Sequence, residues 1–418
     1  MIEAPATGTS LVALRLESFR GYARLDAAFG PGPQLLWGPN AAGKTSLLEA
    51  IALLAWGHSH RSTVDPELIR WGDDVARIEG DLQREAGDAS PAVGSPEHAA
   101  DRLEVALVRP GSVAAAGGAR KRIRVNGIAR RASSLADHLR VVLFAPEDML
   151  LVVGSPTLRR ATLDRLASGL WPAYAEALAT YGRALQQRNS LLRLIREETA
   201  TRDELRYWDE PFLDAGAEVV ARRHRLLSEL SGPLAAAHAE IAPEEAAEAG
   251  LGLRYLTNAP AGPDETPRQA LARRLAETAE KEVWNGTTLI GPHRDDIAFE
   301  LAGRDLAGFA SRGQQRTAIL ALKLAELDLL AGRDDRPPLL LLDDVFSELD
   351  PARRSHLVRR IASLPQAFVT TTTLDDLDPA LLRIATAWEV RAGQGGAELA
   401  PSAGPKPERG SAETERAR

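Results

Sequence analysis

Cysteine is absent from this 418-residue chain, which excludes disulfide bridges, thiolate metal sites, iron–sulfur clusters and a cysteine nucleophile. No apolar run approaches the roughly 18 residues that a membrane-spanning helix needs, so we expect no membrane segment and no membrane partner. The first residues carry neither a basic nor an apolar stretch. No signal peptide is therefore predicted, and a cytoplasmic location is expected.

Lysine is scarce as well, with five lysines among the 51 basic residues and arginine making up the rest. The 58 acidic residues leave a net charge of −7, which argues against a protein that coats nucleic acid through bulk attraction. A local basic patch remains compatible with that charge. The composition, 44% hydrophobic and 26% charged, is typical of globular proteins, and the length suffices for two or three domains.

The apolar pattern near the beginning of the chain alternates over 12–16 and 25–29, which predicts two half-buried strands joined by a turn at 19–21. A third strand is predicted over 34–37, and helical spacing of leucines predicts a helix from Thr45. The elements predicted further along are strands over 287–290, 297–301, 339–342 and 367–371, and helices after Gln315 and over 352–363. Residues 157–240 are predicted to be helical with breaks at Pro172, Pro211 and Pro233. We expect a flexible loop within 85–120 and a disordered tail from 393.

A phosphate-binding loop is the strongest motif. The pattern G-x-x-x-x-G-K-[ST] is matched by Gly38, Pro39, Asn40, Ala41, Ala42, Gly43, Lys44 and Thr45. The motif lies between a predicted strand and a predicted helix, which is the context that supports it. Glycines let backbone N–H groups surround an anion at a helix N-terminus. Lys44 is then expected to reach the β- and γ-phosphates of ATP, and the Thr45 hydroxyl to bind Mg²⁺.

A second acidic element follows the apolar run 339–342. Such a run is typical of a buried central strand, whose final carboxylate emerges at the ligand edge of a parallel sheet. Asp343 is predicted to hold Mg²⁺, and Asp344 to act as the catalytic base or to orient water. The alternative for Asp344 is a purely structural role as the cap of the following segment.

A third element selects among P-loop proteins. Ser311, Arg312, Gly313 and Gln314 precede a predicted helix and resemble the S-x-G-Q signature of ABC-type ATPases, while residues 347–350 resemble their D-loop. The long insertion between the phosphate loop and this signature is similar to the plan of SMC proteins, but it is too short and too proline-rich for a long coiled coil. The resemblance implies an α/β fold: an ABC-type ATPase head, made of a P-loop parallel sheet and an antiparallel strand subdomain, with an inserted, mainly helical second lobe.

The predicted organisation has four parts. They are an N-terminal part of the head (1–156), a helical lobe or short arm (157–285), a C-terminal part of the head (286–392) and a disordered tail (393–418).

The order of these motifs resembles the RecF family of bacterial recombination-mediator ATPases. The segments that carry the resemblance are Phe19-Arg20, 38–45, 59–62, 144–148, Arg159-Arg160, Leu163-Asp164, 187–189, 291–296 (GPHRDD), 311–315 and 343–350. The resemblance implies that 291–296 belongs to the head, although a plain turn is the alternative for this segment. It also implies that Arg20 and Arg61 lie next to the nucleotide.

The implied function is ATP-dependent DNA binding in recombinational repair, covering single-strand gap repair, recombinase loading, replication and the SOS response. The resemblance implies a weak ATPase with Mg²⁺, and an ATP-dependent homodimer in which Ser311 to Gln314 contact the partner's nucleotide. Duplex DNA, single-strand/double-strand junctions and mediator proteins such as RecR are the implied partners. The alternative is an ABC-type ATPase subunit that serves a protein or membrane partner.

Residues 102–131 carry a local excess of positive charge, from which Arg120, Lys121, Arg122 and Arg124 are predicted as DNA contacts. The alternative is that such runs are solvated faces, as they often are.

Transporter ATPases carry a histidine after the acidic strand and a catalytic glutamate, whereas this chain has threonines at 370–373 and Asp344. These departures predict slow hydrolysis that suits a switch.

Overall fold

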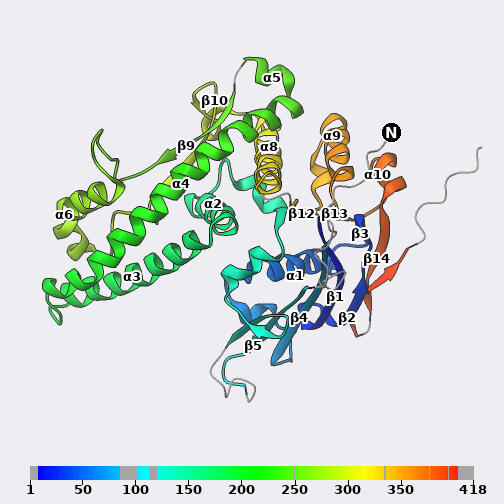
Figure 1. Ribbon diagram of the computed structural model, residues 1–418, viewed down its shortest axis with the longest axis horizontal. Coiled ribbons are helices and arrows are strands. Elements are labelled where there is room, and N and C mark those ends of the chain that lie inside the picture. Colours follow the sequence, from blue (N-terminus) through cyan, green and yellow to red (C-terminus); the bar gives the residue numbers. More distant parts are fainter. Residues whose placement is uncertain are drawn as a thin grey trace, which may run out of the picture. The chain divides into compact units, whose positions relative to one another are not determined.

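The computed structural model describes residues 8–84, 101–112, 120–248, 250–333, 336–375, 377–393 and 395–402. The chain divides into two compact units. Unit 1 comprises residues 1–54, 58–129 and 339–418, and unit 2 comprises residues 55–57 and 130–338. The α/β class is confirmed, because unit 1 carries a parallel and an antiparallel sheet and unit 2 is mainly helical (Figure 1).

The parallel sheet of unit 1 carries the phosphate loop. Its parallel strands lie in the order β14, β3, β13, β12, and β15 adds an antiparallel edge. The strands and the helical segments in the same stretches of chain are β3 (Gly32–Trp37), α1 (Lys44–Trp56), β12 (Leu339–Asp343), η6 (Val345–Glu348), α9 (Pro351–Ala362), β13 (Gln366–Thr371), α10 (Pro379–Ile384), β14 (Thr386–Gly393) and β15 (Gly396–Pro401). Every residue of β12 and β13 is buried, as expected for apolar strands in the middle of a parallel sheet.

The second sheet of unit 1 is antiparallel, in the order β2-β1-β4-β5-β6-β7. Its strands, and the short helix η1 before β4, are β1 (Thr9–Phe19), β2 (Tyr22–Ala28), η1 (Asp65–Leu68), β4 (Val75–Arg84), β5 (Asp101–Val108), β6 (Lys121–Val125) and β7 (Ile128–Ala129). Burial alternates along β4, where Ala76, Ile78 and Leu82 are fully buried. One face of the sheet is therefore apolar and the other presents charged side chains, the usual state of an antiparallel sheet.

The prediction that the chain is disordered from residue 393 is wrong for residues 396–401. Strand β14 reaches Gly393, and β15 pairs with it from Gly396↔Gly393 to Pro401↔Trp388. Backbone hydrogen bonds of a tight hairpin order this segment despite its composition. Residues 403–418 lie outside the described residues, as do 85–100 and 113–119 of the predicted flexible loop, while 101–108 form β5.

Unit 2 is built around long helices. Its elements are η3 (Ala132–Asp137), β8 (Val141–Phe144), η4 (Pro146–Leu150), α2 (Pro156–Leu170), α3 (Pro172–Arg196), η5 (Arg202–Glu204), α4 (Leu205–Ile241), α5 (Pro243–Glu248), β9 (Leu251–Leu256), α6 (Pro267–Asn285), β10 (Asp296–Leu301), β11 (Arg304–Asp305), α7 (Leu306–Phe309) and α8 (Arg312–Ala331). Helices α3 and α4 run side by side (Figure 1). The 37 residues of α4 give a length of roughly 55 Å.

The breaks predicted at Pro211 and Pro233 are wrong, because α4 continues through both prolines. A proline removes one hydrogen bond and strains the preceding turn. The buried face of α4, which includes Phe212, Leu230 and Leu234, holds the helix in place against its neighbours. Pro172 does mark a break, since α3 begins there.

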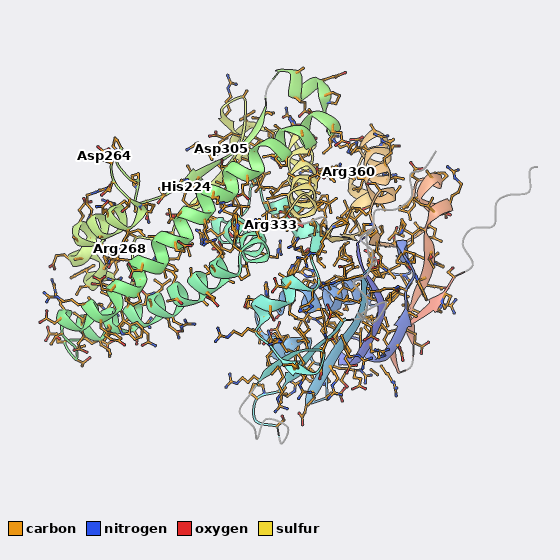
Figure 2. The ribbon with its side chains drawn as sticks, in the orientation of Figure 1. His224, Asp264, Arg268, Asp305, Arg333 and Arg360 are labelled. Atoms are coloured by element: carbon orange, nitrogen blue, oxygen red, sulfur yellow. The ribbon has the colours of Figure 1, made fainter. Side chains whose placement is uncertain are left out.

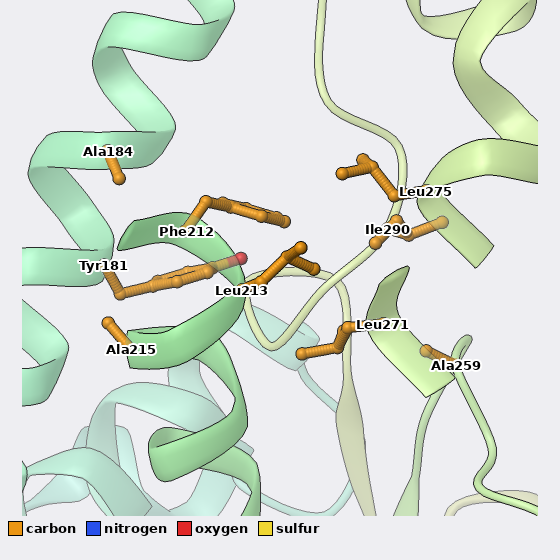
Figure 3. Packing of buried hydrophobic residues seen from close by; sticks show 9 residues of the cluster. All are labelled: Tyr181, Ala184, Phe212, Leu213, Ala215, Ala259, Leu271, Leu275 and Ile290. Atoms are coloured by element: carbon orange, nitrogen blue, oxygen red, sulfur yellow. The ribbon is translucent and has the colours of Figure 1, made fainter. Parts of the chain in front are cut away.

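A hydrophobic cluster joins α3, α4 and α6 with the segment before β10 (Figure 3). Its central rings, Tyr181 and Phe212, lie with centroids 5.0 Å apart, and Leu271, Leu275 and Ile290 pack around them. Charged side chains tie the same helices together at the surface: Arg268, labelled in Figure 2, bridges α6 to Asp214 and Glu210 of α4.

The strand predicted over 287–290 is wrong, because these residues form no strand. Strand β10 pairs instead with β9 and β11 in a small sheet of unit 2. The predicted boundaries at 156 and 285 also differ from the two units: residues 130–156 and 286–338, expected in the head, are grouped with the helices. In the described part of the chain, none of the helices is both long enough and apolar enough to cross a membrane.

Candidate nucleotide-binding site

The loop between β3 and α1 has the backbone that the sequence motif requires. Gly38 has φ = +150°, and a Cβ at this position would lie 2.2 Å from the carbonyl oxygen of Val390, so only glycine fits. Ala41 also adopts a positive φ of 62°. The loop turns sharply into α1, which begins at Lys44. The backbone N–H groups at the start of α1 and the positive end of the helix dipole are suited to an anion.

Lys44 lies across this loop and is 7% exposed. Its Nζ donates hydrogen bonds to the carbonyl oxygens of Gly38, at 2.8 Å, and Pro39, at 2.9 Å. Burial lowers the pKa of the Lys44 ammonium, while the nearby carboxylates of Asp344 and Asp343 oppose that shift. The lysine is thus held at the loop within the field of both aspartates.

Asp343 is the last residue of β12 and is 6% exposed. Its Oδ1 accepts a hydrogen bond from the Thr45 hydroxyl, at 3.0 Å, and one from the Thr370 hydroxyl, at 2.7 Å. Strand β13 lies between β3 and β12, so Thr370 stands between the loop and the acidic strand end. A carboxylate and a hydroxyl so close together are ligands that Mg²⁺ prefers.

Asp344 follows with φ = +52° and ψ = +28°, a conformation that is costly for residues other than glycine and is often found at functional sites. It stands at the N-cap position of η6 but makes no side-chain capping bond. The structural alternative, a helix cap, therefore lacks its hydrogen bond. The Asp344 N–H donates to the Thr370 hydroxyl, at 2.9 Å.

The sequence analysis did not identify the role of Thr370, which positions both Asp343 and Asp344. The run of four threonines was visible in the sequence, and its position at the end of a strand next to the acidic strand was the signal. A threonine hydroxyl can donate one hydrogen bond and accept others, and Thr370 uses both abilities, toward Asp343 and from Asp344.

The two arginines predicted next to the nucleotide meet at a residue that sequence reasoning also missed. Glu49 of α1 is fully buried. It accepts bonds from the guanidinium of Arg20, at 2.8 and 2.9 Å, and from the Ser59 hydroxyl, at 2.5 Å, while Arg61 lies 3.9 Å away. Burial alone would raise the pKa of Glu49, but the bonds from Arg20 and Ser59 hold it below its ordinary value. Glu49 thus fixes Arg20 beside α1.

The signature residues lie in unit 2, at the start of α8. Ser311, Arg312 and Gly313 are exposed. Ser311 and Gln314 form a reciprocal capping box, with bonds of 3.2 and 3.0 Å between side chain and backbone. This box starts the helix and leaves the Ser311 side chain at the surface. In unit 1, Asp350 of the D-loop caps α9 through the Arg353 N–H, at 3.0 Å.

The basic stretch near β6 is balanced by acids from neighbouring strands and, for Lys121, from η1. Its ion pairs join Arg102 with Asp81 (2.8 Å), Lys121 with Asp65 (2.8 Å) and Arg124 with Glu104 (3.6 Å). Arg120 and Arg122 are exposed and make no ion pair with any residue that the structure describes. The positive excess counted along the sequence is therefore much reduced in space, because cross-strand partners come from distant segments.

The GPHRDD segment lies in unit 2 among buried polar groups. Arg223, 2% exposed, donates to both carboxylate oxygens of Asp164, at 2.9 Å each, and to the Pro292 carbonyl, at 2.7 Å. Buried Asp295 accepts a bond from the Tyr255 hydroxyl, at 2.7 Å. Burial raises the pKa of Asp295 even though these partners lower it.

His293 completes this cluster, which we call the unit 2 network (Asp164, Arg223, Tyr255, His293, Asp295). The Nδ1 atom of His293 lies 2.5 Å from the Tyr181 hydroxyl, and burial lowers the pKa of His293 to about 4. Gly291 has φ = +116°, and a Cβ there would lie 2.6 Å from the same hydroxyl. The partners named here all lie in unit 2, and that this segment joins the head stays a prediction.

The geometry of unit 1 fits a nucleoside triphosphate with Mg²⁺. The loop and the start of α1 present backbone N–H groups, Lys44 supplies a cation, and Thr45 with Asp343 supplies the oxygen ligands. A phosphate loop after one parallel strand, a carboxylate at the end of another, and a helical unit inserted between them define an ABC-type ATPase head.

Comparisons with known proteins agree with this class. A family model of the RecF/RecN/SMC N terminal domain matches residues 10–383. The DNA replication and repair protein RecF of Herpetosiphon aurantiacus is 41% identical over 381 residues, covering 88% of this chain and 94% of the relative. The protein of the same name from Geobacillus thermodenitrificans is 37% identical over 388 residues, covering 92% and 98%. The chain belongs to the RecF family.

Solved structures show the same likeness. The recombination mediator protein RecF-ATPrS of the RecFOR pathway is similar with a TM-score of 0.80 and 28% identity, over 94% of this chain and 99% of that one. The Smc head domain of Pyrococcus furiosus with an extended coiled coil has a TM-score of 0.50 and 15% identity, over 94% and 96%. The second likeness concerns the fold alone.

Proposed function

We propose that this chain is an ATP-dependent DNA-binding protein of recombinational DNA repair, acting in the cytoplasm in single-strand gap repair, recombinase loading, replication and the SOS response. The observation that carries the proposal is the 3.0 Å hydrogen bond between Thr45 and Asp343. It brings together two motifs that lie 298 residues apart in sequence. The names of the relatives, DNA replication and repair proteins, support the DNA side of the proposal.

Each residue of the site has a role in this proposal. Gly38 to Gly43 hold the phosphates through their backbone N–H groups, and Lys44 neutralises the terminal phosphates. Thr45 and Asp343 hold Mg²⁺, which when bound supplies charge neutralisation at the phosphate oxygens. Asp344 orients the attacking water and accepts its proton. Its strained backbone places the carboxylate close enough to Lys44 to oppose the burial-induced fall in the lysine pKa.

Hydrolysis is proposed to be slow. Asp344 is one methylene shorter than the glutamate of transporter ATPases, so it must reach further to the water. Thr370 stands where those enzymes carry a histidine, and it orients the aspartates without supplying a base of suitable pKa. A slow site keeps ATP bound for a long time, which suits a switch.

The switch is proposed to be a homodimer. Ser311, Arg312, Gly313 and Gln314 begin α8 at the surface, where they are free to contact the nucleotide of a second copy. ATP would then hold two chains together, and hydrolysis would release them. The partners proposed for the closed pair are duplex DNA, single-strand/double-strand junctions and mediator proteins such as RecR. Arg120 and Arg122 are the best remaining DNA contacts of the basic stretch, because they lack ion pairs among the described residues.

Sedimentation velocity with ATP and Mg²⁺, with and without gapped DNA, tests this proposal. The wild type should sediment as a dimer with ATP and bind DNA more tightly in that state. Ser311→Arg should bind ATP with unchanged affinity yet fail to dimerise, because the arginine occupies the position of the partner's terminal phosphate. Lys44→Ala should lose ATP binding by about 100-fold, corresponding to about 2.7 kcal/mol.

A mixture of the two variants adds a control. The intact Lys44 of one chain and the intact Ser311 of the other form one composite site, so partial dimerisation should return. If Ser311→Arg alone abolished ATP binding, the assignment of the signature to the partner's nucleotide would be wrong. ATP turnover indifferent to DNA would favour a subunit that serves another partner.

A further inference from the structure

Three arginines of unit 2 gather on one buried tryptophan, away from the residues to which the proposed function gives a role. Trp171 is 5% exposed, and the guanidinium carbons of Arg222, Arg225 and Arg333 lie 5.9, 5.2 and 5.6 Å from the centroid of its ring. A cation within about 6 Å of an aromatic centroid is attracted to the ring. We call these four residues the Trp171 cluster; Arg333 is labelled in Figure 2.

The tryptophan is a fixed platform between α2 and α3. Its N–H donates to the Ala167 carbonyl of α2, and its carbonyl accepts a bond from the Tyr174 N–H of α3, at 2.9 Å each. Two of the arginines belong to α4 and the third follows the end of α8, so the ring holds together cations from separate helices. Because the ring is buried, it cannot stack on a nucleobase. A ligand of the cluster must be recognised by the arginines.

Contact with the ring leaves most hydrogen-bond donors of these arginines available. A cation–π contact uses the charge of a guanidinium and none of its five N–H groups. Arg222 gives its Nε–H to Glu218, and Arg225 gives its Nε–H to Glu229, the latter at 2.7 Å. The Nη groups of both make no bond among the described residues, and Arg333 makes neither a hydrogen bond nor an ion pair there.

The donors are also open to solvent. The side chain of Arg225 is 59% exposed and that of Arg222 is 25% exposed, and Arg333 is exposed as well. The two glutamates balance two of the three cations, whereas the charge of Arg333 has no partner in the described part of the chain. Several unused N–H groups around an uncompensated positive charge suit an anion with several oxygens, and phosphate matches the fork of an arginine.

We propose that the Trp171 cluster binds phosphates of the DNA backbone. The inference rests on the proposed DNA binding and adds a contact surface on unit 2 to the one that Arg120 and Arg122 supply on unit 1. The indole keeps the guanidinium groups together, and their Nη–H groups donate to phosphate oxygens. Since no base reaches the buried ring, the cluster contributes to affinity without regard to sequence.

Fluorescence anisotropy of a labelled DNA duplex, with ATP and Mg²⁺ over a range of salt concentrations, tests the proposal. Each phosphate contact contributes a slope of about −0.9 to the dependence of log K on the logarithm of the salt concentration. Arg225→Gln combined with Arg333→Gln should weaken binding and reduce the magnitude of this slope by about 1.8. The effect should be the same for duplexes of two different sequences. Arg206→Gln, at an arginine of α4 whose side chain is 83% exposed, is the matched control and should change neither quantity.

A second pair of variants tests the platform. Trp171→Phe keeps an aromatic face for the arginines and should bind DNA like the wild type. Trp171→Leu removes that face and should weaken DNA binding in the same direction as the loss of the arginines. Equal DNA binding by folded Trp171→Leu and the wild type would overturn the role of the ring. The arginine variants, which change exposed side chains, decide the matter if Trp171→Leu fails to fold.

ATP affinity and ATP-dependent dimerisation of the same variants separate failure of this inference from failure of the proposed function. Both should stay at the wild-type level in the double arginine variant, because the nucleotide loop is in unit 1 and the signature residues are intact. Unchanged DNA affinity and salt slope in that variant, with a wild type that binds DNA, would overturn the inference. A wild type that does not bind DNA with ATP would refute the proposed function itself.

Two further outcomes would assign the cluster to another ligand. Loss of dimerisation together with DNA binding in the double variant would overturn the inference and make the cluster a contact between two copies of the chain. Inorganic phosphate, added at constant ionic strength, should not abolish the difference between the wild type and the double variant. If it did, the cluster would be a site for the free ion and not for the DNA backbone.

Discussion

Each of the two units contains a buried cluster of charged and polar side chains, but the two clusters have different roles. In unit 1, Lys44, Thr45, Asp343 and Thr370 converge at the ends of parallel strands, beside a backbone with positive φ at Gly38, Ala41 and Asp344. In unit 2, the network around Arg223 is equally charged but lies among helices, with the arginine bound on several sides.

This difference shows how a ligand-binding cluster can be distinguished from one that only stabilises the fold. Arg223 is 2% exposed and donates hydrogen bonds to Asp164, Tyr255 and Pro292, so a ligand has no access to it. Among the described residues, Lys44 donates its hydrogen bonds to carbonyl oxygens of its own loop, at 2.8 and 2.9 Å, and a phosphate can replace these at little cost. Buried charge is thus compatible with both functions, and the state of its hydrogen-bond partners decides between them.

The largest effect is expected in the unit 2 network. Arg223→Met leaves Asp164 without its cationic partner, and breaking a buried pair costs about 3–5 kcal/mol. Urea denaturation should show this loss of unfolding free energy, while ATP affinity stays near the wild type because the site is in unit 1. Arg202→Ala removes an exposed pair with Glu280 and serves as the control with no measurable change. A stable Arg223→Met variant with weak ATP binding would reverse the comparison.

A smaller effect is expected from the positioning residue of the unit 1 site. Thr370→Val removes the hydroxyl that binds Asp343 and Asp344. Loss of such a supporting partner typically lowers metal affinity about 10-fold to 100-fold. The Mg²⁺ concentration needed for ATP binding should rise by about tenfold, whereas ATP binding without Mg²⁺ should not change. Thr370→Ser should restore the wild-type value, and Thr372→Val, at an exposed neighbour, is the control. Equal Mg²⁺ dependence in Thr370→Val would show that Thr370 only packs.

A pH-dependent effect concerns the histidine of the network. The folded state lowers the pKa of His293 to about 4, whereas an unfolded histidine titrates near 6.5. The unfolded chain therefore binds more protons between these values, and stability is lost as the pH falls from about 6.5 toward about 4. Burial raises the pKa values of Asp295 and Glu282. These two carboxyl groups therefore contribute the opposite pH dependence, and they favour the folded state as the pH falls through the acidic range.

The difference between wild type and His293→Gln isolates the histidine. Denaturation midpoints measured across this range should converge as the pH falls, because only the wild type carries the titrating ring. The same comparison with Lys44→Ala in place of His293→Gln should show no convergence, since the ATP site does not take part. Parallel curves for wild type and His293→Gln would mean that the ring is protonated equally in both states.

The sequence predicted the local elements of unit 1 well. The strands β1, β2, β3, β12 and β13 and the helices α1 and α9 lie where periodicity indicated, as does α8 of unit 2. Alternation and helical spacing depend on near neighbours in the chain, so they can be recognised without the fold. Composition was a poorer guide, as β15 shows: a polar, glycine-containing tail pairs with β14 because a hairpin needs only backbone groups.

The sequence by itself determined the phosphate loop, the acidic strand end and the family, because each depends on residue types at fixed short spacings. The tertiary structure alone decided which distant residues meet. It brought Thr370 into hydrogen-bond contact with Asp343, Glu49 with Arg20, and the GPHRDD segment with Arg223. It also paired the basic stretch with acids of neighbouring strands and of η1. Hydrogen bonds and ion pairs act over a few ångströms in space, whatever the separation along the chain, and no local pattern records them.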